Sequence, residues 1–204
     1  MKKCLLFLCV VAISLSASAQ FAGLPVADSA VSPVAGETRV SAGAVLGDDF
    51  NLYGGRLSFA PIGRLAFFAD LGAIDPDFGD IGLAAQLGGK FTLPLKDSPV
   101  DIALRASWSY AAFDLDGGGD TTANAFTGGA LVSREVGLFS PYVFIGLNFT
   151  DQEAKRAGVK ATSDDTDLAF AIGAILNLTR EFSFYGEFAY VDDPFFGLGG
   201  RWTF

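Results

Sequence analysis

Histidine is absent from the chain of 204 residues, and the two cysteines, Cys4 and Cys9, lie close to the N-terminus. Catalytic triads and Cys–His pairs use histidine as the base that activates the nucleophile, so this chain lacks that base. Zinc sites are disfavoured for the same reason, because their usual ligands are His and Cys. A pair of carboxylates, as in glycosidases, is the one catalytic arrangement left open. The sequence therefore predicts no enzyme, no catalytic residue and no cofactor.

One stretch has the carboxylate spacing of a cation-binding loop. Asp114, Asp116 and Asp120 recur in the sequence Asp-Leu-Asp-Gly-Gly-Gly-Asp, and calcium prefers oxygen ligands at alternate positions. The stretch lacks the closing glutamate and the flanking helices of an EF-hand. We therefore predict a solvated acidic loop, with divalent-cation binding at these three residues as the alternative and no defined metal site.

Other charges lie within segments that alternate between apolar and polar residues, always on the less apolar face. They are Arg39, Arg56, Asp70, Lys90, Asp101, Arg105, Glu187 and Arg201. In a closed β-barrel this face would line the lumen, where an unpaired charge is costly. We expect these charges to pair and to plug the lumen; a selective pore is the alternative. If residues 192–194 form a connection, Tyr185 lies opposite Arg201 and Glu187 lies diagonal to it.

Ten alternating segments carry these charges. They span residues 38–46, 52–60, 64–73, 81–93, 100–110, 122–134, 141–150, 165–178, 182–191 and 195–204. Most are close to the roughly nine to eleven residues that a tilted strand needs to cross a bilayer. Connections after even-numbered segments are short, whereas several after odd-numbered ones are longer and rich in Asp, the longest being residues 151–164. This contrast is typical of a membrane barrel with short periplasmic turns and longer outer loops.

The apolar face is too bulky for the inside of a small barrel. Half of the residues are hydrophobic, Phe occurs 20 times, and the mean hydropathy is +0.39. A soluble barrel has the same periodicity, but its interior has no room for so many Phe, Leu and Ile side chains. The pattern therefore favours a barrel whose apolar face contacts lipid.

The last segment ends on an aromatic residue. Phe196, Leu198, Trp202 and Phe204 share one face of residues 195–204, and an exposed apolar end of this kind needs an apolar surrounding. Aromatic residues also recur at both ends of the other segments, which predicts two interfacial girdles. We expect this segment to be the closing strand of the barrel.

The N-terminus has the features of a secretory signal peptide. Residues 1–19 combine two lysines, an apolar run too short to span a membrane as a helix, and small residues before a cleavage position after Ala19. Residues 20–37 show no period and are interpreted as a flexible leader. Both cysteines fall in the signal peptide, so no disulfide is expected in the mature chain. Bulky Leu8 disfavours lipid attachment at Cys9.

The charge of the chain disfavours nucleic acid as a partner. Removal of Lys2 and Lys3 with the signal peptide changes the net charge from −9 to −11. Phosphate backbones are bound by basic patches, which such an acidic chain does not offer.

The signal peptide, the ten alternating segments and the ending Gly-Gly-Arg-Trp-Thr-Phe make the chain resemble the outer-membrane β-barrel proteins of Gram-negative bacteria, in particular the small OmpA-like and opacity-type barrels. The resemblance implies an all-β, antiparallel, up-and-down transmembrane barrel of about ten strands over residues 38–204, where small members often have eight. It also implies that the barrel-assembly machinery recognises Phe196, Leu198, Trp202 and Phe204, and that outer-membrane lipid and lipopolysaccharide surround the barrel.

We therefore expect a non-enzymatic integral protein of the bacterial outer membrane, exported by its signal peptide, with a structural or cell-surface interaction role. A narrow porin-like channel for ions or small solutes is the first alternative. A soluble secreted ligand-binding barrel is the second. Among partners, divalent cations at the acidic loops are a further alternative.

Overall fold

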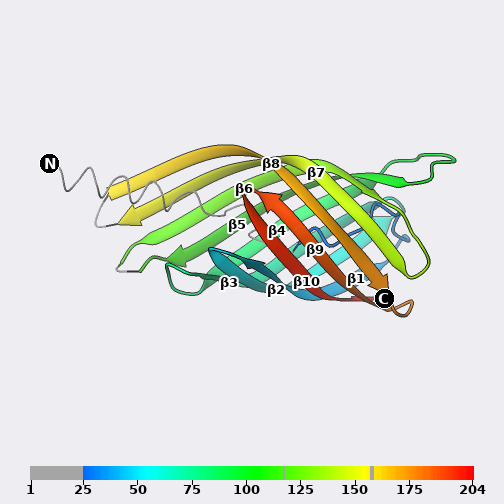
Figure 1. Cartoon of the computed structure of the whole chain (residues 1–204), viewed down its shortest axis with the longest axis horizontal. Helices are drawn as coiled ribbons and strands as arrows, with labels where there is room; N and C mark the ends of the chain where they lie inside the picture. Colours follow the sequence, from blue (N-terminus) through cyan, green and yellow to red (C-terminus); the bar gives the residue numbers. More distant parts are fainter. Residues whose placement is uncertain (1–24, 117, 157–158) are drawn as a thin grey trace.

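The computed structural model describes residues 25–116, 118–156 and 159–204. They form ten strands: β1 (Thr38–Gly47), β2 (Phe50–Ile62), β3 (Leu65–Pro76), β4 (Gly82–Thr92), β5 (Asp101–Asp114), β6 (Asp120–Ser133), β7 (Phe139–Arg156), β8 (Val159–Asn177), β9 (Phe182–Val191) and β10 (Asp193–Thr203). Each strand pairs with the next, and β1 pairs with β10, so the antiparallel sheet closes into a barrel (Figure 1). The predicted fold class is confirmed. No helix within the described ranges is long and apolar enough to cross a membrane.

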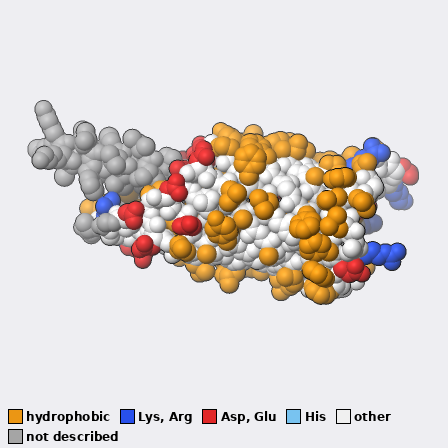
Figure 2. Space-filling model, turned by 60° about the horizontal axis from the view of Figure 1, so that its bottom comes forward, with side chains coloured by type: hydrophobic (Ala, Val, Ile, Leu, Met, Phe, Trp, Pro, Cys, Tyr) orange, Lys and Arg blue, Asp and Glu red, His pale blue; other side chains and the backbone are white. Residues whose placement is uncertain are grey.

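The alternation of side chains determines which face of each strand meets the outside. In β4, Leu83, Leu87 and Phe91 point outward and are 43–55% exposed, whereas Gln86 and Lys90 point inward and are 2% exposed. An apolar outside and a polar inside reverse the usual arrangement of a soluble protein. Hydrophobic side chains spread over the barrel wall in Figure 2, and charged side chains lie mainly towards its two ends. This surface fits a barrel embedded in a membrane.

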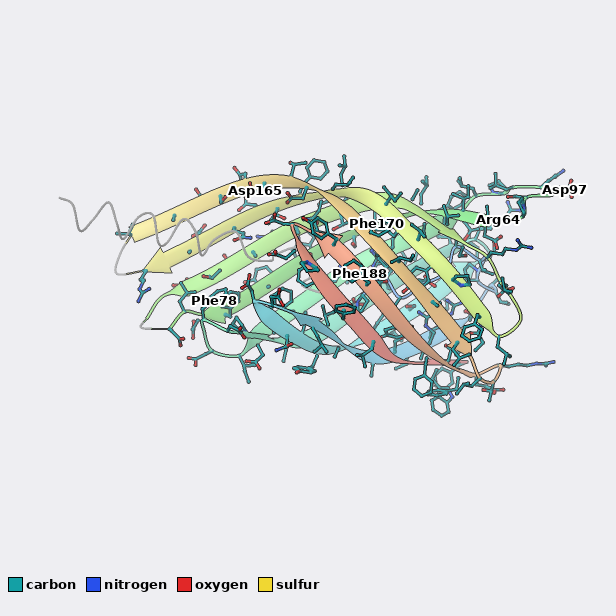
Figure 3. All side chains as sticks on the ribbon, viewed as in Figure 1. Arg64, Phe78, Asp97, Asp165, Phe170 and Phe188 are labelled. Atoms are coloured by element: carbon teal, nitrogen blue, oxygen red, sulfur yellow. The ribbon has the colours of Figure 1, made fainter. Side chains whose placement is uncertain are left out.

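The barrel has two distinct ends. The terminal end carries Thr38, Phe204 and the connections after the even-numbered strands, and Arg64 and Asp97 project from it (Figure 3). The loop end carries the connections after the odd-numbered strands, including Phe78. At the terminal end Thr38 and Phe204 exchange backbone hydrogen bonds of 2.8 and 3.3 Å, so the two ends of the sheet are joined there.

The connections at the two ends differ from the prediction. The longest loop was expected at residues 151–164, but β7 and β8 remain paired from Phe139 opposite Leu176 to Arg156 opposite Val159. The loop prediction is wrong because a ladder of backbone hydrogen bonds continues through polar residues that show no apolar alternation. Conversely, the connection at residues 93–100 lies at the terminal end, where only short turns were expected. The barrel therefore gains its asymmetry from a long β-hairpin, not from long coils.

The N-terminal segment also differs from the prediction. Residues 25–37, which we call the lumenal segment, were expected to belong to a flexible leader. Instead Val26, Ala27 and Ala30 are at most 2% exposed, and the segment bonds to inward-facing side chains of β2, β4 and β9. It is drawn in blue in Figure 1. The signal peptide predicted at residues 1–19 and the start of the predicted leader, residues 20–24, lie outside the described residues.

Candidate functional site in the barrel lumen

All eight charges predicted for the lumen lie on inward-facing positions of their strands. Six are at most 7% exposed: Arg56, Asp70, Lys90, Arg105, Glu187 and Arg201. Arg39 and Asp101 lie near the terminal end and are partly exposed. The pairing of the strands explains why several of these charges meet. Directly paired positions place Arg201 beside Ser41, Ser41 beside Arg56, and Arg56 beside Asp70 across four neighbouring strands.

The best-defined pair in the lumen joins Arg56 and Asp70. The guanidinium Nε and Nη2 donate to Asp70 Oδ1 and Oδ2 at 2.7 Å each, which is the bidentate geometry of a strong ion pair. Arg56 Nη2 and Arg105 Nη2 both donate to Gln86 Oε1 at 3.3 Å. The two guanidinium groups also lie 4.7 and 4.5 Å from the centre of the Phe68 ring. These contacts hold two neighbouring cations around one aromatic side chain.

A second group of charges is completed by the lumenal segment. Asp28 Oδ2 lies 2.8 Å from Lys90 Nζ, and Asp28 Oδ1 lies 3.2 Å from Arg39 Nη1 and 3.9 Å from Arg201 Nη1. We call these four residues the Asp28 cluster. Arg39 also pairs with Glu37. One carboxylate from outside the sheet therefore contacts cations of three strands, β1, β4 and β10.

Glu187 has different partners from the one predicted. Its carboxylate accepts hydrogen bonds from the backbone N–H groups of Val26 and Ala27 at 3.0 and 2.9 Å and from Tyr142 Oη at 2.7 Å. The register places Gly197 opposite Glu187 and Ser183 opposite Arg201.

The predicted alignment of Tyr185 with Arg201 is therefore wrong by two residues. The cause is a shorter turn: Asp193 already pairs with Val191, and Asp192 takes a positive φ of 62°. Arg201 instead donates to the carbonyl of Ala27 and, at 3.4 Å, to Ser41 Oγ.

The lumen also has an apolar layer that sequence reasoning missed. Near the loop end the inward residues are Val45, Phe50, Leu52, Ile74, Val191 and Phe195, all at most 3% exposed. The rings of Phe50 and Phe195 have their centres 5.4 Å apart. Alternate residues of β10 point inward, and continuing this alternation from Gly197 to Phe195 would have identified Phe195 as inward-facing. Phe50 could not be assigned because it lies between the predicted segments 38–46 and 52–60.

The candidate cation loop is not assembled as a metal site. Asp114 pairs with Asp120 across β5 and β6, and Asp120 Oδ2 lies 3.9 Å from Lys155 Nζ. The backbone N–H of Asp116 donates to the carbonyl of Phe78, so this backbone is tied to the β3–β4 connection. Within residues 25–116, 118–156 and 159–204, no group of three or more carboxylates converges to hold a metal ion.

The β7–β8 hairpin carries a compact charge cluster outside the membrane-spanning part of the barrel. Glu153 lies between two ammonium groups, 2.5 Å from Lys160 Nζ and 3.0 Å from Lys155 Nζ. Hydrogen bonding to Lys160, and then to Lys155, lowers the pKa of Glu153. Both lysine side chains are more than half exposed, so the cluster is available at the surface.

The residues of the predicted assembly signal lie on the outer face of β10 and just beyond its end. Phe196, Leu198, Trp202 and Phe204 are 59, 52, 51 and 74% exposed. Trp202 packs against Phe182 of β9 with ring centres 5.1 Å apart. The closing strand therefore presents large apolar side chains on its outer face.

A family model described as "Outer membrane protein beta-barrel domain" matches the chain from residue 5 to residue 194. The chain belongs to this family. Its members are barrels of the outer membrane, which agrees with the apolar outer face and the closed sheet seen here. The outer-membrane barrel predicted from the sequence is thereby confirmed at the level of family and fold. No curated protein matches the chain.

Several solved outer-membrane barrels are similar to this family member in shape. The attachment invasion locus protein Ail of Yersinia pestis aligns with 14% identity and a TM-score of 0.48, over 84% of this chain and 100% of Ail. The N-terminal barrel domain of OprF of Pseudomonas aeruginosa aligns with 12% identity and a TM-score of 0.42, over 84% and 100%. Neisserial surface protein A aligns with 11% identity and a TM-score of 0.40, over 82% and 95%.

The Arg56–Asp70 pair leads to a prediction about stability. The substitution Asp70→Ala leaves a buried guanidinium without its carboxylate, so the free energy of unfolding should fall by about 3–5 kcal/mol. Urea unfolding of the barrel in phospholipid vesicles, followed by tryptophan fluorescence, measures this change.

Asp101→Ala is the matched control. Asp101 is inward-facing but partly exposed, so its loss should change the free energy of unfolding by about 1 kcal/mol or less. An equal loss of stability in the two variants would show that the Arg56–Asp70 pair has no special role.

Proposed function

We propose that this protein is a non-enzymatic outer-membrane barrel whose lumen is closed by its own N-terminal segment and whose role is structural or interactive at the cell surface. The observation that carries the proposal is the contrast between inside and outside. The lumen is filled by mutually bonded side chains and by residues 25–37, whereas the β7–β8 hairpin exposes its charged side chains.

The state of the lumenal carboxylates supports a non-enzymatic role. Catalysis by a carboxylate pair needs one group that donates a proton and one that acts as base or nucleophile, with room for substrate between them. Both carboxylate oxygens of Asp70 accept hydrogen bonds from Arg56, one from Nε and one from Nη2. Glu187 accepts three hydrogen bonds from within the chain. Both groups are committed to holding the interior together.

The exposed hairpin supports a surface role. Its outward face passes from Phe149 through Asp151 and Glu153 to Lys155, so it changes from apolar to charged along its length. Such a sequence suits the boundary between the membrane and the water layer. The loop end would face the outside of the cell, and Thr38 and Phe204 at the terminal end would face the periplasm.

Export and assembly complete the proposal. Residues 1–19 would direct secretion, and the outer face of β10 would be the surface that the barrel-assembly machinery recognises. Outer-membrane lipid and lipopolysaccharide would surround the finished barrel. The acidic loops would share divalent cations with lipopolysaccharide phosphates, without a fixed metal site.

Surface display of the hairpin can be tested by labelling intact cells. In a background in which Cys4 and Cys9 are replaced by Ser, Thr162→Cys should react with a membrane-impermeant maleimide because it lies on the exposed hairpin. Arg180→Cys, at the exposed β8–β9 turn of the other end, is the control and should react only after lysis. Labelling of Arg180→Cys alone in intact cells would reverse the orientation.

The narrow channel is the second candidate, because the lumen contains more buried cations than carboxylates. The filled lumen favours a closed barrel. Purified full-length protein in planar lipid bilayers should therefore give no single-channel current steps. Reproducible steps that disappear after substitution of Arg105 or Arg201 would establish the channel instead.

The role of the C-terminal residue in assembly can be separated from its role in stability. Phe204→Ala keeps the backbone hydrogen bonds to Thr38 but removes the aromatic ring. We expect several-fold less heat-modifiable barrel in the outer membrane of cells and unchanged refolding into vesicles. Phe59→Ala, which removes another half-exposed aromatic ring, is the control. An equal cellular loss for both variants would contradict a recognition role.

A further inference from the structure

We propose that Arg39, Lys90 and Arg201 form a binding site for a small carboxylate in the lumen, and that Asp28 occupies this site as a ligand carried by the chain itself. The inference goes beyond the proposed surface role and does not depend on it. If the lumenal segment withdraws, the same cations are available to a free monocarboxylate.

The geometry of Asp28 is that of a bound ligand. Its two oxygens face different cations: Oδ2 faces Lys90 Nζ at 2.8 Å, and Oδ1 faces Arg39 at 3.2 Å and Arg201 at 3.9 Å. The cations come from three separate strands, whereas Asp28 lies in a segment outside the sheet. A planar carboxylate satisfies this arrangement with both oxygens, as charge-assisted contacts require.

The charge of the barrel wall shows why a carboxylate is needed. The buried charged side chains of the described residues are four cations, Arg56, Lys90, Arg105 and Arg201, and two carboxylates, Asp70 and Glu187. Asp70 is bound by Arg56. Glu187 is turned towards the lumenal segment and Tyr142. The wall therefore leaves Lys90 and Arg201 without a carboxylate of its own, and buried cations of this kind attract an anion.

Arg105 adds to this excess of positive charge. In the part of the chain that the structure describes, no carboxylate lies within ion-pairing distance of its guanidinium; its partners are Gln86 and the ring of Phe68. In the register of β4 and β5, Arg105 also lies directly opposite Lys90, a second cation. The interior beside the Asp28 cluster is therefore electropositive, which favours any anion that reaches it.

The contacts of the lumenal segment are of a kind that can be exchanged. Lys90 Nζ donates to the carbonyl of Ser29 at 2.5 Å, Thr92 Oγ1 donates to the carbonyl of Ala30 at 2.9 Å, and the N–H of Ala30 donates to Ser133 Oγ at 2.8 Å. Water can replace each of these partners. A small cleft is lined in part by Asp28, Arg39 and Lys90, so the surface reaches the edge of the cluster there.

Chemical rescue tests the site. Asp28→Ala removes a group of the size of formate and should lower the midpoint of heat-induced unfolding, followed by gel mobility of the full-length barrel in detergent. Sodium formate should restore at least half of the lost midpoint, whereas sodium chloride at the same ionic strength should not. Sodium phosphate, which is larger and tetrahedral, should restore less than formate. The unsubstituted protein should respond to none of these salts.

Two further variants decide the interpretation. Asp28→Ala combined with Lys90→Gln should lose the response to formate, because the cation that faces Oδ2 is gone. Asp101→Ala, which removes a carboxylate outside the cluster, should show no formate response. Equal effects of formate and chloride, or an undiminished response in the Lys90→Gln background, would overturn the proposal.

The site can still be tested if Asp28→Ala has a folding defect. If Asp28→Ala fails to refold in chloride, refolding that depends on formate supports the site. Failure to refold in both salts, while Asp28→Asn refolds in chloride, would overturn it, because position 28 would then need only a polar side chain of the right shape. A surface role of the hairpin would stand in either case.

Discussion

A buried charge inside a narrow barrel needs a partner of opposite sign or hydrogen-bonding groups close by, because it has lost most of its contact with bulk water. The wall of this barrel carries more buried cations than carboxylates, so a sheet closed on these residues alone would hold uncompensated positive charge. Asp28 supplies a carboxylate to the cations of the wall. The backbone N–H groups of Val26 and Ala27 donate hydrogen bonds to Glu187. The lumenal segment is therefore part of the folded barrel.

The architecture could be predicted because lipid imposes the same rule on every strand. Apolar residues at every second position of β4 fix its phase, and the sequence predicts β9 at its observed bounds, residues 182–191. The rule fails where lipid ends. Residues 151–164 alternate in neither hydropathy nor size, yet β7 and β8 stay paired there, because a hairpin outside the membrane needs only its backbone ladder and a suitable turn.

The sequence predicts which charged residues line the lumen but not which of them contact one another. The inward parity of the strands identifies Lys90 and Arg201, since parity is a local property of the sequence. Their shared partner Asp28 lies in a stretch without periodicity, and nothing in the sequence links it to residues of β4 and β10. Register is equally hidden: a turn shortened at Asp192 moves Arg201 from Tyr185 to Ser183. Pairings depend on such turns, which composition does not reveal.

The lumenal segment continues directly into β1, so Asp28 is separated from the first residue of the sheet by residues 29–37 alone. A ligand held on so short a tether has an effective local concentration in the millimolar range at the site, independent of the concentration of the protein. Free carboxylates must exceed that value to compete. Asp28 therefore occupies the site under most conditions. A free anion replaces it only when that anion is abundant or when the lumenal segment leaves the lumen.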